Sequence, residues 1–577
     1  MKLRYLTIVA GLSMLGLSSC SDFLDTAPDT RVELVTVEQL RELLVTGYNS
    51  YDYSVVGEMS SDNMIDNNSP DDKGNRENLS SYDVGDEELF AWEDVKSNIS
   101  GDSPSTIWSG CYNAIATANV VLERVAELEA DPSKLSDSER EMLSAVKGEA
   151  LLIRAYHHFI LVNVFCMPYQ GDNPVTYDGR TVDYQGIPYM THSETEVKPH
   201  YDRGTVADVY RMIEADIEAG VPLINDAIYE IPKYHFNRAA ANAFAARFYL
   251  FKRDYEKVVK YADAAFNGAN PLDRQSDIWS HRLDGLFYYV SDIARYYTST
   301  SRSNVFMCIA TYSTWLRRYG ARYGTNREAK RATIEGAGPT WENCKWRNTQ
   351  TQEVFSMHPC FNGLCMSSEY GRWFCGMAEQ FEYTDKLAGI GYPHIVRAEF
   401  TGEETILCRA EAKLFLGDIE GCFNDLKIWD DGRQNVGEEN TGLVELTHAL
   451  IKKFYSASGE GRYYGIMKDI HIDEVCPSDK YHVTEEMIPY LQCIQHYRRI
   501  ETIHNGMRWF DIKRYGLSFT HKIGKNRVER LHTLDPRYAI QIPSEVLSAG
   551  FTENPRVLPQ PASQMAVPST KNIVPVK

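Results

Sequence analysis

The sequence lacks a cluster of basic residues. Its 60 Lys and Arg stand against 80 Asp and Glu, which gives a formal net charge of −20. Phosphate binding needs clustered Lys and Arg, so this balance excludes nucleic acid as a partner. The same imbalance excludes electrostatic adhesion to an anionic membrane surface.

The sequence also lacks the cysteine spacing of a disulfide framework or a structural zinc site. Eleven of its twelve cysteines follow Cys20, an odd number spread along the chain. The densest group has no C-x2-C pair and consists of Cys344, Cys360, Cys365 and Cys375 with His358 beside it. We expect buried thiols, with one disulfide as an open alternative, and neither a metal nor a cofactor.

Motifs of common enzymes are missing as well. The chain has no G-x-S-x-G elbow, phosphate-binding loop or H-E-x-x-H motif. Carboxylates are so numerous that pairs of them do not indicate a glycosidase. His157 and His158 lie within an apolar helix, where packing is expected, and His471 with Asp473 is a further candidate pair of metal ligands. The sequence favours a binding protein, with a surface hydrolase as the alternative from another class.

The N-terminal apolar run is too short to span a membrane. Leu6 to Leu17 follow Lys2 and Arg4, whereas a membrane-spanning helix needs about 20 apolar residues. These proportions are typical of a secretory signal peptide. Small residues precede Cys20, which indicates cleavage there and lipidation of the cysteine. An ordinary signal peptide followed by a chance cysteine is the alternative.

Helical periodicity covers most of the remaining chain. The spacing of apolar residues, capping residues and prolines predicts helices over 37–48, 107–128, 138–165, 205–223, 237–251, 254–266, 403–416, 418–429, 485–504 and 507–515. Residues 62–86 are rich in Asp, Asn, Ser and Gly but lack the spacing of a calcium loop, so an exposed loop is expected.

Two of the predicted helical hairpins resemble each other. Residues 245–254 align with 409–418, and the matched pairs are Ala246/Ala410, Leu250/Leu414, Phe251/Phe415 and Asp254/Asp418. Small residues allow close helix packing, and the aspartates suit the start of the second helix. Such a repeat is typical of tetratricopeptide-like hairpins, which stack to bury their apolar faces.

An irregular region rich in Gly, Tyr and Trp lies between the hairpins. Strand-like stretches are expected at 287–290 and 303–310 within it. Long irregular segments on a rigid scaffold commonly carry binding residues. Aromatic faces stack on sugars or clamp peptides, and the residues predicted to form such a stacking platform are Trp92, Tyr289, Tyr296, Trp315, Trp341 and Trp346.

Seven segments, taken in their order along the chain, resemble those of a known protein family. They are Cys20–Pro28, Trp108–Leu122, Gly148–Tyr156, Thr205–Tyr210 with Ala239–Ala246, Glu403–Ala412 with Gly417–Asp418, Arg498–Arg514 and Ile540–Pro555. Together they resemble the SusD/RagB family of nutrient-binding outer-membrane lipoproteins of Bacteroidetes. Within the most recognisable segment, Arg508 and Asp511 are expected to form an i,i+3 pair and Trp509 and Phe510 to pack.

The resemblance implies both a fold and a function. The fold would be mainly α, a tetratricopeptide-like helical-hairpin scaffold with an irregular loop-rich subdomain that contains a few short strands. The function would be non-catalytic: capture of glycans at the cell surface, with the lipid on Cys20 as outer-membrane anchor and a SusC-like TonB-dependent transporter as partner. The RagB branch handles peptides, which stay the alternative ligand. No ligand contact carries over by motif.

These expectations divide the chain into five parts. They are a signal peptide (1–19), a lipidated tether (20–35), an N-terminal helical region (36–269), a loop-rich ligand-binding subdomain (270–400) and a C-terminal helical region (401–577).

Overall fold

The computed structural model describes most of the chain between residues 36 and 556. Within that span it leaves out 71–73, 75, 81, 98–100, 173–174, 178–179, 183, 195–200, 269–294, 296–297, 314, 326–328, 330, 334–335, 348–353, 357–364, 369–370, 375–378, 433–441 and 464.

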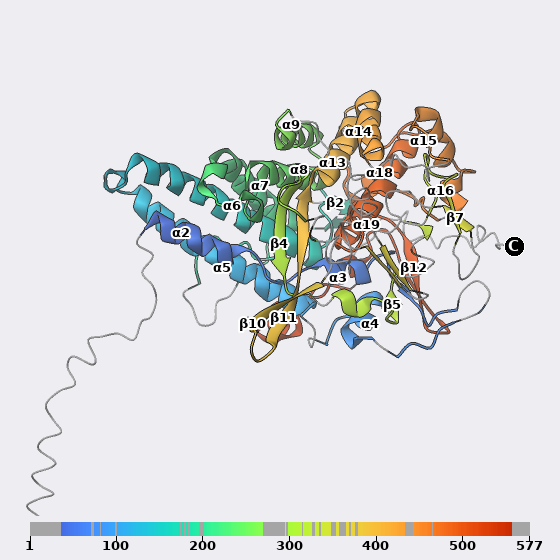
Figure 1. Cartoon of the computed structure of the whole chain (residues 1–577), viewed down its shortest axis with the longest axis horizontal. Coiled ribbons are helices and arrows are strands. Elements are labelled where there is room, and N and C mark those ends of the chain that lie inside the picture. The colour runs from blue at the N-terminus through green and yellow to red at the C-terminus, as the bar shows by residue number, and fades with distance from the viewer. Residues whose placement is uncertain are drawn as a thin grey trace, which may run out of the picture.

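Helices form the framework, as the periodicity predicts (Figure 1). The main ones are α2 (Val37–Leu44), α5 (Pro104–Glu129), α6 (Asp137–Phe165), α7 (Val206–Gly220), α8 (Arg238–Lys252), α9 (Tyr255–Phe266), α13 (Gly402–Phe415), α14 (Ile419–Asp431), α18 (Ile488–Glu501) and α19 (Met507–Tyr515). Ser103 and Ser136 begin the two longest helices with capping boxes, so the backbone N–H groups at these N-termini are satisfied. No described helix is both long and apolar enough to cross a membrane.

The two hairpins predicted to repeat have equivalent geometry. Asp254 and Asp418 both accept a hydrogen bond from the first turn of their helices, α9 and α14. The residue before each aspartate adopts a left-handed conformation, with φ of 61° at Arg253 and 83° at Gly417. Helix α13 packs against both α8 and α9, so the hairpins stack as the repeat predicts (Figure 1).

Short helices and strands fill the spaces between the hairpins. The helices are α3 (Ser54–Met59), α4 (Val84–Phe90), α15 (His448–Phe454), α16 (Glu460–Tyr463), α17 (Ile472–Val475) and α20 (Ser544–Ser548). The two-stranded pairs are β1 (Ile65–Asp66) with β5 (Tyr323–Gly324), β2 (Val175–Tyr177) with β3 (Arg180–Val182), β6 (Lys345–Arg347) with β7 (Val354–Ser356), β8 (Cys365–Ser368) with β9 (Gly371–Phe374), and β12 (Phe519–Ile523) with β13 (Arg527–Leu531).

One antiparallel sheet of three strands lies against the helices. Its order is β10 (Glu379–Asp385), β11 (Ile390–Thr401) and β4 (Val305–Thr311). Strand β4 confirms the strand expected at 303–310, whereas 287–290 falls outside the described residues. Burial alternates from Ile395 to Glu399 on β11, so in this part of the sheet one face packs on the body and the other is turned outward. The strand ends where α13 begins, which fixes the sheet to the helical scaffold.

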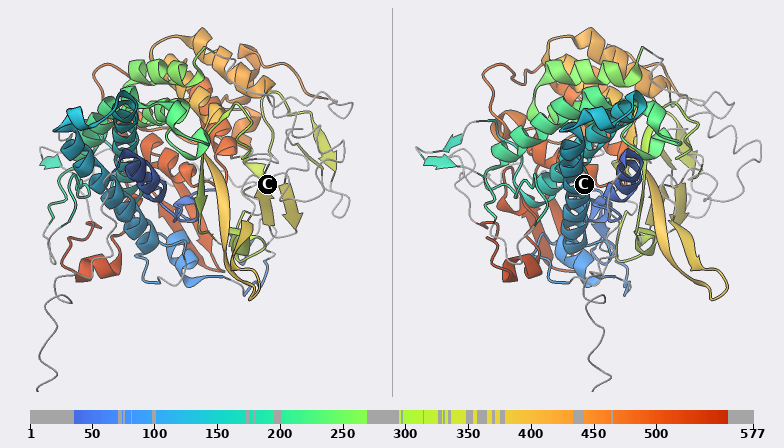
Figure 2. Two further views of the ribbon diagram at one scale, coloured as in Figure 1. Left: turned by 60° about the vertical axis from the view of Figure 1, so that its left-hand side comes forward. Right: turned by 90° about the vertical axis from the view of Figure 1, so that its left-hand side faces the viewer.

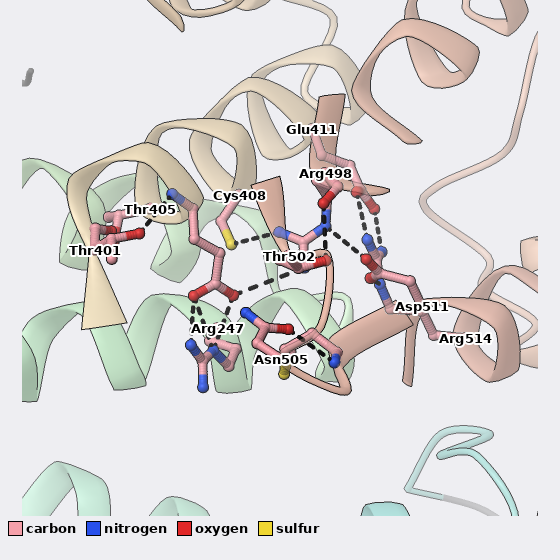
Figure 3. A network of polar contacts seen from close by, with 12 residues as sticks. Arg247, Thr401, Thr405, Cys408, Glu411, Arg498, Thr502, Asn505, Asp511 and Arg514 are labelled. Carbon is pink, nitrogen blue, oxygen red and sulfur yellow. Dashed lines mark hydrogen bonds and ion pairs between the residues drawn. The ribbon is translucent and has the colours of Figure 1, made fainter. Parts of the chain in front are cut away.

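Buried ion pairs connect the C-terminal helices to the rest of the fold (Figure 3). Arg498 donates to Asp511 at 3.0 Å, and Arg514 donates to the same carboxylate at 2.7 Å. The i,i+3 partner of Asp511 is therefore Arg514, so the expected pairing of Asp511 with Arg508 is wrong. Trp509 and Phe510 are buried in the core, which confirms that they pack.

Arg508 instead holds the segment expected to be an exposed loop. Its Nε and Nη2 donate to Asp62 at 2.7 and 2.9 Å, and the Asp62 side chain is only 8% exposed. Asn63 and Asp66 are buried as well. The expectation of a solvated loop is thus wrong for its first part, because distant arginines supply the charge that makes burial of these polar side chains possible.

The pairing of Asp62 with Arg508 predicts how the free energy of unfolding depends on pH in acid. Burial alone raises the pKa of Asp62, but the guanidinium groups of Arg499 and Arg508 outweigh burial and hold the pKa well below its ordinary value. The stabilisation is therefore present above the unfolded-state pKa of about 3.9 and is lost as the pH falls below it. Asp62→Asn should lower the free energy of unfolding by about 3 kcal/mol at pH 7, and by less as the pH falls from about 4 towards about 2.

Urea unfolding at several pH values measures the difference in free energy of unfolding between Asp62→Asn and the parent protein. Asp137→Asn is the matched control, because Asp137 pairs with Arg140 at the surface and its side chain is 96% exposed. It should change the stability by less than about 1 kcal/mol. A deficit of Asp62→Asn that stays constant from about pH 4 to about pH 2 would contradict the role of the charge.

Candidate functional site

Three of the tryptophans predicted to form a stacking platform lie in the core. Trp92, Trp315 and Trp341 are 7%, 2% and 0% exposed. Each indole N–H donates to a backbone carbonyl at 2.8 to 2.9 Å, of Ser60, His504 and Gly336 respectively. The structure thus gives these side chains a packing role and leaves no indole face open to a sugar.

The described part of the structure does not include the side chains of the other predicted site residues. The backbone of Trp346 belongs to β6, and its side chain falls outside the described part of the structure. Tyr289, Tyr296 and the lipidation candidate Cys20 lie outside the described residues altogether.

The candidate metal ligands have ordinary structural partners. His157 and His158 are fully buried, and each shares a hydrogen bond between its Nδ1 and a carbonyl one helical turn earlier. Asp473 accepts from Arg253 at 2.9 Å, and Cys344 is a buried free thiol. Within the described ranges no group of three His, Cys, Asp or Glu side chains is placed to hold a metal.

A partly exposed aromatic cluster instead lies on the outward face of the three-stranded sheet. Tyr312, which directly follows β4, is 38% exposed. Its ring centroid is 4.6 Å from that of Tyr392 on β11, in an edge-to-face arrangement, and 6.0 Å from that of Tyr51. Glu382 is the cross-strand partner of Tyr392, and its carboxylate lies 3.8 Å from His394. We call these five residues the tyrosine face.

Backbone pairing and a buried ion pair hold this face in place. Tyr51 forms a parallel bridge with Tyr312, whose N–H donates to the Ser50 carbonyl at 2.7 Å. The next residue, Asp52, pairs with the buried guanidinium of Arg397 on the inward side of β11. The segment that carries Tyr51 is therefore fixed against the sheet from beneath.

Hydrogen bonding within the tyrosine face shifts the pKa of one hydroxyl group, that of Tyr392. A hydrogen bond with Tyr312, reinforced by partial burial and the negative charge of Glu382, raises the pKa of Tyr392 to about 12. The phenol therefore stays protonated at physiological pH and can donate or accept hydrogen bonds. The face thus offers apolar ring surfaces beside hydroxyl, carboxylate and imidazole groups, which suits a polar ligand with flat apolar patches.

Comparison with known proteins shows which of them share this fold. The fold matches solved structures of SusD superfamily proteins from Bacteroides thetaiotaomicron (17% identity, TM-score 0.54, 90% of this chain and 100% of that one), Bacteroides vulgatus (17%, 0.53, 90% and 99%) and Bacteroides fragilis (15%, 0.56, 89% and 98%). Residues 22–250 match the SusD-like family model described as starch-binding and associating with the outer membrane. Residues 22–250 are thus similar to the SusD-like family, and the fold of the chain is that of the SusD superfamily structures. No curated protein sequence matches it.

The SusD-like resemblance and the mainly α fold expected from the sequence are thereby confirmed. The residues of the tyrosine face were not among the predicted site residues, although Tyr312 and Tyr392 lie in the segment 270–400 expected to bind the ligand. In the sequence, Pro393 indicates an edge or irregular strand position beside Tyr392 but does not show that the ring lies at the surface.

The two aromatic sets differ in a way that stability measurements can test. Trp315→Ala removes a core side chain and should lower the free energy of unfolding by about 3 to 5 kcal/mol. Tyr392→Ala removes a half-buried surface ring and should lower it by about 1 kcal/mol or less. Chemical denaturation of both variants checks this, and equal losses would contradict the assignment of the tryptophan to the core.

Proposed function

We propose that this SusD-like protein is a cell-surface lipoprotein that captures oligo- or polysaccharides and delivers them to a SusC-like TonB-dependent transporter. The observation that carries the proposal is the tyrosine face, an exposed aromatic surface on a fold shared with SusD-like proteins. The family model's description as starch-binding supports a glycan as ligand.

Ring geometry supports sugar binding at the tyrosine face. The Tyr312 and Tyr392 rings stand nearly perpendicular, with an interplanar angle of 84°, so they present a ring face and a ring edge to the same ligand. Sugars have apolar C–H faces rimmed by hydroxyls, and Glu382 and His394 supply hydrogen-bonding groups for such a rim.

Hydrolysis is less well supported than binding. Glycosidases use two carboxylates about 5 to 9.5 Å apart on either side of the scissile bond. The tyrosine face carries one carboxylate, that of Glu382. We therefore propose capture without turnover.

A peptide is the second candidate ligand because of the position of β10. This strand forms an edge of the three-stranded sheet, and an extended peptide can pair with such an edge through backbone hydrogen bonds. Its side chains would then lie beside the tyrosine face.

Calorimetry against a panel of soluble glycans and peptides tests the proposal. A glycan should bind, and Tyr312→Ala/Tyr392→Ala should weaken that binding about tenfold, because each ring contact contributes about 0.5 to 1.5 kcal/mol. Tyr82→Ala is the matched control, since Tyr82 is 42% exposed but lies outside the sheet. Heat from peptides alone would overturn the glycan proposal, and cleavage of any panel member would overturn capture without turnover.

The anchor is tested separately. Cys20→Ala should leave the melting temperature unchanged and release the protein from the outer-membrane fraction, because acyl chains contribute about 0.8 kcal/mol per buried methylene. Cell fractionation followed by immunoblotting measures the distribution. If Cys20→Ala stays with the membrane in a strain that has the transporter but not in one that lacks it, contact with the transporter is the main tether.

A further inference from the structure

Asp52 lies beneath the tyrosine face, and both oxygens of its carboxylate have partners there. The side chain is fully buried. Its Oδ1 accepts from the Ser54 N–H at 2.7 Å and from the guanidinium group of Arg397 on β11. Its Oδ2 accepts from the hydroxyl of Thr311, the last residue of β4, at 3.3 Å. One carboxylate therefore joins β4 and β11 to the segment that contains Asp52.

Each of these three segments also carries a ring of the tyrosine face. Tyr51 directly precedes Asp52, Tyr312 directly follows Thr311, and Tyr392 lies on β11. Successive residues of an extended backbone point to opposite faces, so a carboxylate beneath the sheet can hold backbone whose rings project above it. The hairpin end of β11 stands off from the helices in the right-hand view of Figure 2, so this end depends on contacts made closer to the body.

Several charged and titratable side chains face Asp52 from the surrounding elements. They are Arg397, Glu399, Asp102, Tyr53, Tyr156 and His157. All of them except Asp102 line, together with Asp52, a cavity with room for about one water molecule. The cavity leaves space for the Asp52 side chain to rotate once its ion pair is lost.

Protonation of Asp52 is the change that removes this ion pair. Burial raises the pKa of Asp52, and the guanidinium group of Arg397 lowers it by less. The charges of Asp102 and Glu399 raise it further, so the pKa lies above its ordinary value. In acid the carboxylate therefore loses its charge at a higher pH than an exposed aspartate does. The new proton cannot face the guanidinium group, which has only donors.

The fold tolerates this loss of charge. Arg397 keeps Glu399 as an ion-pair partner at 2.7 Å, so no buried guanidinium group is left without a carboxylate. Because the pKa of Asp52 is higher in the folded protein than in the unfolded chain, its protonation favours the folded state. Acid therefore acts at Asp52 on the arrangement of the site and not on the stability of the fold.

We propose that Asp52 is a positioning residue of the tyrosine face: its charged carboxylate holds the three rings in one arrangement, and its protonation in acid loosens them and releases the ligand. Asp52 is fully buried, so it acts through the rings. Ligand release rests on the proposed function, because it takes the tyrosine face to be the ligand site. The positioning of the rings does not depend on that function.

Fluorine NMR of the ligand-free protein tests the positioning. 3-Fluorotyrosine at position 312 reports on the ring that contacts both of the others. Asp52→Asn, which has the shape of the protonated carboxyl group, should shift this resonance by at least its own linewidth at pH 7. Lowering the pH from about 7 to about 4 should move the parent's resonance towards that of Asp52→Asn and should move the variant's resonance less. Glu382 and His394 titrate in both proteins, so the difference between them isolates Asp52.

Asp62→Asn is the matched control, because Asp62 is also a buried aspartate paired with an arginine, but one on α19. The charge of Asp62 stabilises the fold, so Asp62→Asn should lower the melting temperature more than Asp52→Asn and leave the fluorine resonance unchanged. Thr311→Val removes only the hydroxyl that contacts Asp52, so it should shift the resonance less than Asp52→Asn and serves if that variant does not fold. An unchanged resonance in both variants, or an equal shift in Asp62→Asn, would rule out the positioning role.

Calorimetry with maltoheptaose, a soluble starch fragment, tests the release of a ligand. At pH 7, Asp52→Asn should weaken binding about tenfold, as expected for the loss of one ring contact, and Asp62→Asn should leave it unchanged. From about pH 7 to about pH 4 the affinity of the parent should fall more steeply than that of Asp52→Asn. Equal affinities of these two proteins across this range would rule out release through Asp52. If the parent gave no heat while the fluorine resonance still moved, the proposed function would fail for this sugar and the positioning of the rings would stand.

Discussion

Burial of several guanidinium groups beside carboxylates is the constraint on which the rest of this fold depends. Arg247 reaches Glu404, Arg498 reaches Asp511, and Arg514 reaches both Asp511 and Glu411, all with little or no exposure (Figure 3). Each ion costs several kcal/mol to remove from water, and only a complete set of partners offsets that cost. Because the partners come from α8, α13, α18 and α19, these helices have little freedom to shift independently.

The same constraint extends beneath the tyrosine face. Glu399 accepts from Arg247 at 2.7 Å and forms an ion pair with Arg397 at the same distance, so it connects the helical scaffold to the sheet. Burial raises the pKa of Glu399, but the two guanidinium groups outweigh burial and lower it, which keeps the carboxylate charged. Arg397 in turn pairs with Asp52, next to Tyr51. The tyrosine face is therefore connected to the helical scaffold by buried ion pairs beneath the sheet.

Sequence reasoning succeeded where local patterns decide structure. The long amphipathic helices and the repeat around Asp254 and Asp418 depend on spacing and capping within a few residues, so the sequence contained the information. It failed where residues far apart in the sequence determine the structure. Asp62 is buried only because Arg508 lies 446 positions away. Trp315 and Tyr312 stand three positions apart in the same irregular region, yet one is core and the other surface, and aromatic composition alone does not separate them.

Strand β11 runs from the exposed end of the β10–β11 hairpin to the buried helical scaffold. Exposure falls from 60% at Ile390 to 0% at Phe400, and Thr401 then caps α13 by accepting from the Glu404 N–H. Exposed edge strands risk pairing with other chains, and natural proteins guard them with charges and bulges. Strand β10 has both protections, with Glu382 in the strand and a register shift between Tyr383 and Asp385. The charge and the register shift therefore lower the risk that β10 pairs with a second copy of the chain.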